Sequence, residues 1–262
     1  MPEQNLRVKA VFFDVDGTLL SHTTNMVSIS TRNAVMSLQA KGIKTIVCTG
    51  RDIGAYARLP MGDLHFDGYL TLNGDLLLDS HRKIYAGIPI DQGDMEVLAQ
   101  IFKAKKIPFV MVAKDRVYIN YVDETVIKTQ DSQMSAVPQV GKYNGEKIYQ
   151  IMAFVPAHEQ NILGSILDEC KIISWHDTGI DIIPAEGGKA AGMQKYMELH
   201  GLKSSEIMAF GDADNDIDML ELAGIGVAMG NGTEGAKAAA DYITASVDEN
   251  GIEKALRNFG LI

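Results

Sequence analysis

Two aspartates and a glycine follow an apolar run near the start of the chain. Residues 11–13 are apolar, and Asp14, Asp16 and Gly17 come directly after them. Open α/β sheets bind ligands outside the carboxyl ends of their strands, so a strand that ends in aspartates offers carboxylates at a ligand site. Beyond the strand, a glycine permits the turn that aims both carboxylates at one metal ion. An Asp-Gly turn on a surface loop is the competing interpretation of these residues alone.

Further polar segments favour the metal-site interpretation. The apolar run 207–210 precedes a second acidic cluster, the run 45–47 leads to a hydroxyl residue and a glycine, and a lysine opens a later helix. The residues concerned are Asp212, Asn215, Asp216, Thr49, Gly50, Arg51 and Lys189. Carboxylates, a hydroxyl, backbone N–H groups and an ammonium are the parts that hold Mg²⁺ and a phosphoryl group. The sequence therefore predicts Mg²⁺ as the cofactor and a phosphorylated ligand.

Taken in order, these motifs resemble the haloacid dehalogenase superfamily of phosphotransferases, and within it the Cof-type subgroup (class IIB) of sugar-phosphate phosphatases. The motifs are DVDGT, CTGR, the lysine, GDADND and the segments at residues 227–232 and 238–242. The resemblance covers nearly the whole chain. Its first and fourth motifs are specific when they occur together, whereas the threonine and the lysine are weak by themselves. One departure is Ala190, which follows the lysine where the family usually has glycine.

The resemblance and the chemistry of the side chains give the acidic residues their expected roles. Asp14 is the predicted nucleophile, because a carboxylate attacks phosphorus without a base to remove a proton. Asp16 is the predicted general acid and base, and its backbone carbonyl is a predicted metal ligand beside the carboxylates of Asp14 and Asp212. Asp216 is predicted to hold the metal's ligands in place.

The phosphate-binding residues are expected at the other motifs. Thr49 and the N–H of Gly50 would donate to phosphate oxygens, and Lys189 would stabilise charge in the transition state. Arg51 is expected to attract the phosphate. Asn215 is expected to bind the phosphate or to support the metal's ligands.

Other metals fit the sequence poorly. A calcium-binding loop that starts at Asp212 would need glycine at its sixth position and glutamate at its twelfth, where Ile217 and Ala223 stand. The six histidines are scattered, and no Cys/His pair has the spacing of zinc ligands.

The composition excludes several classes of function. The chain of 262 residues has 24 Lys and Arg against 34 Asp and Glu, a net charge of −10. Nonspecific binding to DNA or RNA depends on a basic footprint, so we expect no nucleic-acid partner. No apolar run approaches the roughly 20 residues that span a bilayer, so we expect no membrane partner. The expected partner is a small phosphorylated metabolite, and the expected assembly is a monomer or a small homo-oligomer.

The start of the chain and the two cysteines predict a cytoplasmic protein. The first residues lack the basic segment and the long apolar stretch of a signal peptide. Cys48 and Cys170 offer no disulfide framework. Cys48 lies in an apolar run and is expected to be a small core residue rather than a nucleophile. Cys170 is expected at the end of a helix.

The order of the predicted elements indicates an α/β fold. A strand over residues 9–13, a helix over residues 30–41 that ends at Gly42, and a strand over residues 44–48 form a β-α-β unit. Alternation of helices and strands resumes at Lys189. We therefore expect a doubly wound, mostly parallel, Rossmann-like core sheet.

Between these halves the pattern changes to that of an α+β module with an antiparallel sheet. A hairpin signal, Asn73-Gly74, joins strands 69–72 and 75–78 before the change. The later expected elements are helices over residues 92–105 and 158–170 and strands over residues 109–113, 117–121, 148–154, 172–175 and 180–183.

The predicted domains are a catalytic core of residues 1–82 and 184–262 and an inserted cap of residues 83–183. The family resemblance implies a cap that closes over the site and selects the substrate. Gly187 and Gly188 are either its hinge or a plain loop near the phosphate.

The combined prediction is a Mg²⁺-dependent phosphatase that hydrolyses a small phosphomonoester through an aspartyl-phosphate intermediate. A sugar phosphate or a similar metabolite is the implied substrate. One alternative is a phosphosugar mutase of the same superfamily, which needs a phospho-enzyme shielded from water. Another is a receiver-like module that accepts a phosphoryl group without turnover. Such a module has no need of a second carboxylate beside the nucleophile or of an insert that is itself the size of a domain.

Overall fold

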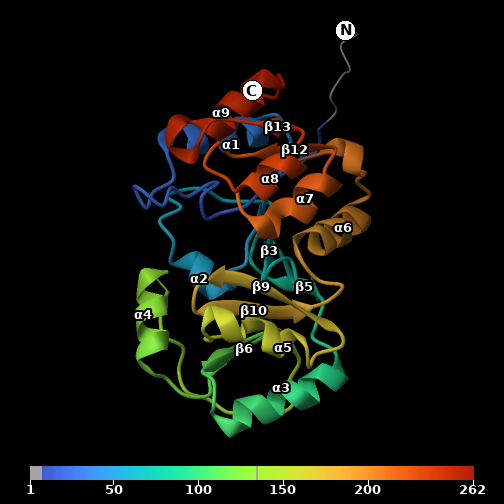
Figure 1. Cartoon of the computed structure of the whole chain (residues 1–262). Helices are drawn as coiled ribbons and strands as arrows, with labels where there is room; N and C mark the ends of the chain where they lie inside the picture. The colour runs from blue at the N-terminus through green and yellow to red at the C-terminus, as the bar shows by residue number, and fades with distance from the viewer. Residues whose placement is uncertain (1–7, 134) are drawn as a thin grey trace. The chain divides into compact units, whose positions relative to one another are not determined.

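The chain divides into two compact units, each built around its own sheet (Figure 1). The computed structural model describes residues 8–133 and 135–262. The first unit contains the described residues up to Tyr85 and those from Lys189 onward, and the second contains residues 86–188. The chain therefore enters and leaves the second unit through two connections, as an inserted module must.

The sheet of the first unit has eight strands among the described residues, in the order β13-β12-β11-β1-β2-β3-β4-β5. Their bounds are β1 Ala10–Phe13, β2 Lys44–Cys48, β3 Gly68–Thr71, β4 Leu76–Asp79, β5 Ile84–Gly87, β11 Ile207–Gly211, β12 Ile225–Ala228 and β13 Tyr242–Ile243. Neighbouring strands from β13 to β3 are parallel, and β4 runs antiparallel to β3. The central strand β1 is completely buried.

Helices lie on both faces of this sheet. Their bounds are α1 Ile29–Ala40, α2 Ile53–Ala57, α6 Lys189–His200, α7 Ile217–Leu222, α8 Glu234–Ala239 and α9 Gly251–Asn258, with short 3-10 turns at η2 Ser204–Glu206, η3 Asp214–Asp216 and η4 Val247–Glu249. The chain moves from β1 to β2 in one direction and from β11 to β12 in the other, so right-handed crossovers place α1 and α7 on opposite faces. Figure 1 shows α6, α7 and α8 side by side, and α1 packs against α9. This arrangement confirms the predicted doubly wound, mostly parallel α/β fold.

Local signals explain where the first helix begins and ends. The Ser28 hydroxyl accepts a hydrogen bond from the N–H of Thr31 at 3.1 Å and so caps the first turn of α1. Gly42, at φ +77°, follows the helix in the left-handed conformation that glycine adopts without strain. These two positions set the start of α1 and the return of the chain into β2.

The sheet of the second unit is antiparallel, with strand order β7-β6-β8-β10-β9. Its elements are α3 Gln92–Ala104, β6 Phe109–Ala113, β7 Val117–Ile119, α4 Glu124–Ser132, β8 Ile148–Ala153, η1 Ala157–Glu159, α5 Gln160–Gly164, β9 Cys170–His176 and β10 Gly179–Pro184. One buried cluster contains Leu98 and Phe102 of α3, Phe109 and Met111 of β6, and Ile151 of β8. The unit therefore has a hydrophobic core of its own.

Two elements in this part of the chain differ from what the sequence predicts. The helix expected over residues 158–170 is shorter: α5 ends at Gly164, and Cys170 starts β9, where it pairs with Pro184 instead of ending a helix. Sheet pairing overrides the helical pattern there. The helix α4 was not predicted at all. The second unit covers residues 86–188, compared with the expected insert of 83–183; β5 belongs to the first sheet, and β10 extends to Pro184.

Candidate active site

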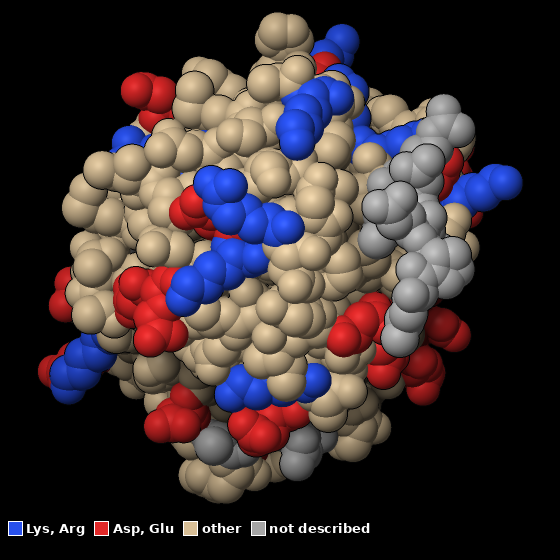
Figure 2. Space-filling view, turned by 90° about the horizontal axis from the view of Figure 1, so that it is seen from above, with Lys and Arg blue, Asp and Glu red and all other residues tan. Residues whose placement is uncertain are grey.

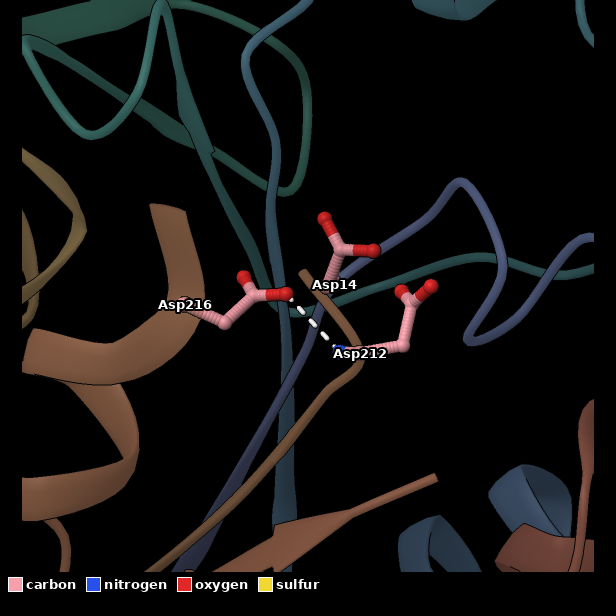
Figure 3. Close-up of side chains that lie close together, drawn as sticks. All are labelled: Asp14, Asp212 and Asp216. Carbon is pink, nitrogen blue, oxygen red and sulfur yellow. Dashed lines mark hydrogen bonds between the residues drawn. The ribbon is translucent and has the colours of Figure 1, made fainter. Parts of the chain in front are cut away.

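The carboxyl ends of β1 and β11 bring Asp14 and Asp212 together. The two strands are parallel neighbours with Phe13 opposite Phe210, and the N–H of Asp14 donates to the carbonyl of Phe210 at 2.9 Å. One carboxylate oxygen each from Asp14, Asp212 and Asp216 lies within 4.8 Å of the other two (Figure 3). Three carboxylates from two distant segments of the sequence therefore form one cluster.

Gly17 is required where the first motif turns beside Asp212. It has φ +87°, and a Cβ at this position would lie 2.2 Å from Oδ2 of Asp212. The Thr18 hydroxyl donates to Oδ1 of Asp212 at 2.9 Å, and the Asn231 amide donates to the carbonyl of Gly17 at 2.9 Å. Thr18 lies in the DVDGT motif and Asn231 in the segment 227–232, but their residue types alone did not predict these contacts.

Lys189 contacts two of the three carboxylates. Its ammonium is 2.6 Å from Oδ1 of Asp14 and 2.5 Å from Oδ1 of Asp216, and its side chain has no exposed area. Oδ2 of Asp216 accepts from the N–H groups of Asp212 and Ala213 at 2.9 and 3.0 Å. Asp216 thus holds the lysine with one oxygen and the loop of Asp212 with the other.

Burial and neighbouring charges perturb the pKa values of Asp14, Asp212 and Lys189. It raises the pKa of Asp14 well above the ordinary value, with Lys189 opposing it and the charges of Asp216 and Asp212 adding to it. Burial, together with the charge of Asp216, raises the pKa of Asp212 to about 6. Burial opposes the charge of Lys189, but the carboxylates of Asp14 and Asp216 outweigh it, so the pKa of this lysine is also raised. A raised carboxyl pKa means that the ionised form is disfavoured, so full ionisation of Asp14 and Asp212 calls for more positive charge than Lys189 supplies.

The donor set fits a divalent cation. When ionised, the three carboxylates carry three negative charges against one ammonium, which leaves an excess of two. Hard carboxylate oxygens are the ligands that Mg²⁺ selects. Among the residues that the structure describes, this is the one group of three or more carboxylate, imidazole or thiol ligands close enough to share an ion.

The CTGR segment contributes a second ion pair. Arg51 contacts both carboxylate oxygens of Asp16, from Nε at 2.7 Å and from Nη2 at 2.9 Å. Thr49 is buried, and its hydroxyl accepts from the N–H of Arg51 at 3.2 Å. The side chain of Asp16 is therefore bonded to Arg51 and is outside the cluster of three carboxylates.

The remaining predicted residues lie beside this segment. The amide of Asn215, from η3, donates to Oδ1 of Asn73 at 3.2 Å, and Asn73 packs against Gly50. Asn73 had been noted only as a turn residue. Cys48 is completely buried, and burial raises the pKa of its thiol, which agrees with a core residue rather than a nucleophile.

Comparisons with known proteins identify the family. A sequence model of the haloacid dehalogenase-like hydrolases matches residues 11–256. The chain belongs to this family. YkrA of Bacillus subtilis is 30% identical over 97% of this chain and 98% of its own length. The 5-amino-6-(5-phospho-D-ribitylamino)uracil phosphatase YitU of Bacillus subtilis is 28% identical over 95% of this chain and 96% of its own length.

Solved structures agree with this membership. BT1666 from Bacteroides thetaiotaomicron, described among phosphatases of this superfamily, has a TM-score of 0.87 and 30% identity over 100% of this chain and 98% of its own. The subclass IIB sugar phosphatase BT4131 has a TM-score of 0.85 and 32% identity over 97% of this chain and 100% of its own. The predicted superfamily, Cof-type (class IIB) subgroup, fold class and hydrolase class are confirmed.

Two surface properties complete the description. Acidic and basic side chains are interspersed over much of the face in Figure 2. No helix in the described residues is long and apolar enough to cross a membrane.

Proposed function

We propose that this hydrolase is a Mg²⁺-dependent phosphatase that cleaves a small phosphomonoester through an aspartyl-phosphate on Asp14. The observation that carries the proposal is the cluster of Asp14, Asp212 and Asp216, two of which contact the buried ammonium of Lys189. Phosphatase relatives over nearly the full length of the chain support the reaction class.

The first half-reaction uses Asp14 and Asp16. An oxygen of Asp14 bonds to phosphorus while the bond from phosphorus to the ester oxygen breaks. Asp16 gives its proton to the departing alkoxide. Arg51 contacts both carboxyl oxygens of Asp16, so this step requires Asp16 to release at least one of these contacts.

The second half-reaction releases inorganic phosphate. Asp16 removes a proton from a water molecule, the water oxygen bonds to phosphorus, and the bond to Asp14 breaks. Lys189 offsets the charge on the phosphoryl group and on Asp14 in both steps. Thr49, the N–H of Gly50 and the amide of Asn215 are the proposed phosphate donors.

A divalent cation would be held by the carboxylates of Asp14 and Asp212 and the backbone carbonyl of Asp16. When bound it supplies the positive charge that lets a carboxylate approach a phosphomonoester dianion. Asp216 supports this group through Lys189 and the N–H of Asp212 rather than as a free ligand.

The second unit is the proposed specificity domain. The candidate catalytic residues all belong to the first unit, and the last residue of the second unit, Gly188, directly precedes Lys189. Relatives that act on a sugar phosphate or on a phosphoribitylamino compound support a small phosphorylated metabolite as substrate. A phosphosugar mutase stays an alternative, distinguished by whether inorganic phosphate is released.

The test is a phosphate-release screen over sugar phosphates, nucleotides, phosphorylated cofactors and phosphoamino acids, with and without Mg²⁺. We expect Mg²⁺-dependent release from at least one class with the wild-type protein and none with Asp14→Asn. Transfer of phosphate within a sugar without release would favour the mutase. Release at the wild-type rate by Asp14→Asn would overturn the proposal.

A further inference from the structure

The turn between β3 and β4 is buried and has an unusual backbone. Leu72 and Asn73 both have φ +55°, and the N–H of Gly74 donates to the carbonyl of Thr71 at 3.1 Å. The Asn-Gly signal thus located the hairpin. Two turns overlap here: the N–H of Asp75 donates to the carbonyl of Leu72 at 3.1 Å, which makes Asn73-Gly74 a central pair as expected, and Leu72-Asn73 is the central pair of the turn before it. Leucine rarely adopts this left-handed conformation. The side chains of Leu72 and Asn73 are nonetheless buried, so the turn is packed into the molecule instead of lying on its surface.

This turn contacts the CTGR segment through its backbone. The N–H of Asn73 donates to the carbonyl of Thr49 at 2.9 Å, and the N–H of Leu72 donates to the carbonyl of Arg51 at 3.1 Å. A Cβ on Gly50 would lie 3.0 Å from Oδ1 of Asn73. The carboxamide of Asn73 is therefore fixed against the backbone that is proposed to bind phosphate.

The same turn contacts the two other segments of the site. A Cβ on Gly192 would lie 2.4 Å from the carbonyl oxygen of Gly74, so α6, which starts at Lys189, packs directly on the turn. The Asn215 amide donates to Oδ1 of Asn73 at 3.2 Å. The Asn73 side chain thus contacts both the loop of Thr49 and Gly50 and the loop that carries Asp212 and Asp216.

We propose that Asn73 is a positioning residue, which orients the Asn215 carboxamide for the phosphoryl group; this inference rests on the proposed phosphatase function. An amide nitrogen carries two hydrogens in one plane, and the bond to Asn73 fixes the direction of one of them. The direction of the second hydrogen is then also fixed, and it can donate to a phosphoryl oxygen. Residues that hold a ligand's partner in this way typically change activity by about 10 to 100-fold when they are removed.

The experiment measures the cost of Asn215→Ala, defined as the fold-loss of kcat/KM on an aryl phosphate, in three backgrounds. The backgrounds are the wild type, Asn73→Asp and Asn73→Gly. Aspartate tolerates the left-handed backbone and keeps an acceptor oxygen, whereas glycine tolerates it without a side chain. We expect a large cost in the wild-type and Asn73→Asp backgrounds. The cost in the Asn73→Gly background should be small, because Asn215 is already misoriented there.

An equal cost in all three backgrounds would overturn the inference, because a purely structural role for Asn73 does not act through Asn215. Asn250→Gly is the matched control, since Asn250 also has positive φ, at +63°, and is exposed at the start of α9. Thermal unfolding of each variant checks that it folds, and Asn73→Ala replaces the glycine variant if that one does not.

The outcome also separates this inference from the proposed function. Asp14→Asn is measured in the same assay. Failure of the wild-type protein to release phosphate would refute the phosphatase itself. Release that depends on Asp14, with equal costs of Asn215→Ala throughout, would refute only the positioning role of Asn73.

Discussion

The two units bury polar side chains in different ways. In the second unit, Asn120 accepts from the N–H groups of Phe109 and Tyr121, and the carboxylate of Asp94 accepts from those of Asp168 and Glu169. Such side chains satisfy the backbone of a folded module.

In the first unit, the buried ammonium of Lys189 contacts Asp14 and Asp216, and with Asp212 three carboxyl groups lie close to this one cation. Burying ionised groups is costly unless they are paired, so an unbalanced cluster indicates a site for a ligand rather than a packing device. The difference shows that burial of a polar side chain does not by itself indicate a functional site. The indication comes from its partners: backbone N–H groups in the second unit, other charged side chains in the first.

The largest expected effect is at Asp14. Asp14→Asn removes the attacking carboxylate, so we expect turnover to fall by about 10⁴-fold or more. The phospho-enzyme should disappear as well, which rapid quenching followed by mass measurement of the intact protein detects. The matched substitution in the second unit is Asp94→Asn, which weakens hydrogen bonds to the backbone. We expect it to lower the unfolding free energy by about 1–3 kcal/mol and to leave kcat near the wild-type value. A folded Asp94→Asn protein without turnover would break the comparison.

A smaller effect is expected at Asp16. Proton transfer contributes typically about 10² to 10⁴-fold, so Asp16→Asn should slow hydrolysis of alkyl and sugar phosphates by that factor in both half-reactions. When the substrate is an aryl phosphate with an acidic phenol, the phenolate leaves without protonation. The variant should therefore release a burst of phenol and then turn over slowly, as stopped-flow absorbance measures. Equal losses on aryl and sugar phosphates without a burst would assign Asp16 to structure, as the partner of Arg51.

Metal binding sharpens the comparison through stability. Mg²⁺ at 100 times its dissociation constant should stabilise the wild-type protein by about 2.7 kcal/mol, seen as a higher unfolding temperature. Asp212→Ala should lose this shift and most of the activity, even in saturating Mg²⁺. An unchanged Mg²⁺ shift in this variant would place the ion elsewhere.

The pH dependence follows from the raised pKa of Asp212, about 6. Without metal, the folded protein holds this proton more tightly than the unfolded chain, so the group favours folding at low pH. That contribution is lost as the pH rises through about 6. Mg²⁺ needs the carboxylate, so stabilisation by Mg²⁺ should act in the opposite sense and fade below this pH. Thermal unfolding with and without Mg²⁺ across pH 5 to 8 measures both trends.

The smallest expected effect is in the second unit, at Trp175. Its indole N–H donates to Oδ1 of Asp181 at 2.9 Å. If the unit selects the substrate, Trp175→Phe should change the ranking of kcat/KM among phosphorylated metabolites by about 10-fold, within the range of one or two lost contacts. Hydrolysis of a small aryl phosphate should stay nearly intact. An unchanged ranking across Trp175 and other surface substitutions would leave specificity in the first unit.

The sequence was most informative where local chemistry and position coincide. Gly42 ends α1 as expected, because glycine alone adopts that backbone conformation without strain. The expected strand over residues 44–48 matches β2, and the helix expected to open at the motif lysine matches α6, which starts at Lys189. Prediction was weaker in the second unit. The helical pattern there predicted that Cys170 ends a helix, but Cys170 pairs with Pro184 in the sheet. Antiparallel pairing is non-local, so a window of sequence does not contain it.

The sequence by itself determined the family, the α/β fold and the residue types of the site, because each motif follows an apolar run whose end must lie at the ligand edge of a parallel sheet. Tertiary structure alone decided the partners. In the folded chain Arg51 pairs with Asp16, Lys189 contacts both Asp14 and Asp216, and Asn215 donates to Asn73. These contacts join segments far apart in the chain, and they depend on strand order and close backbone approach, which neither composition nor spacing encodes.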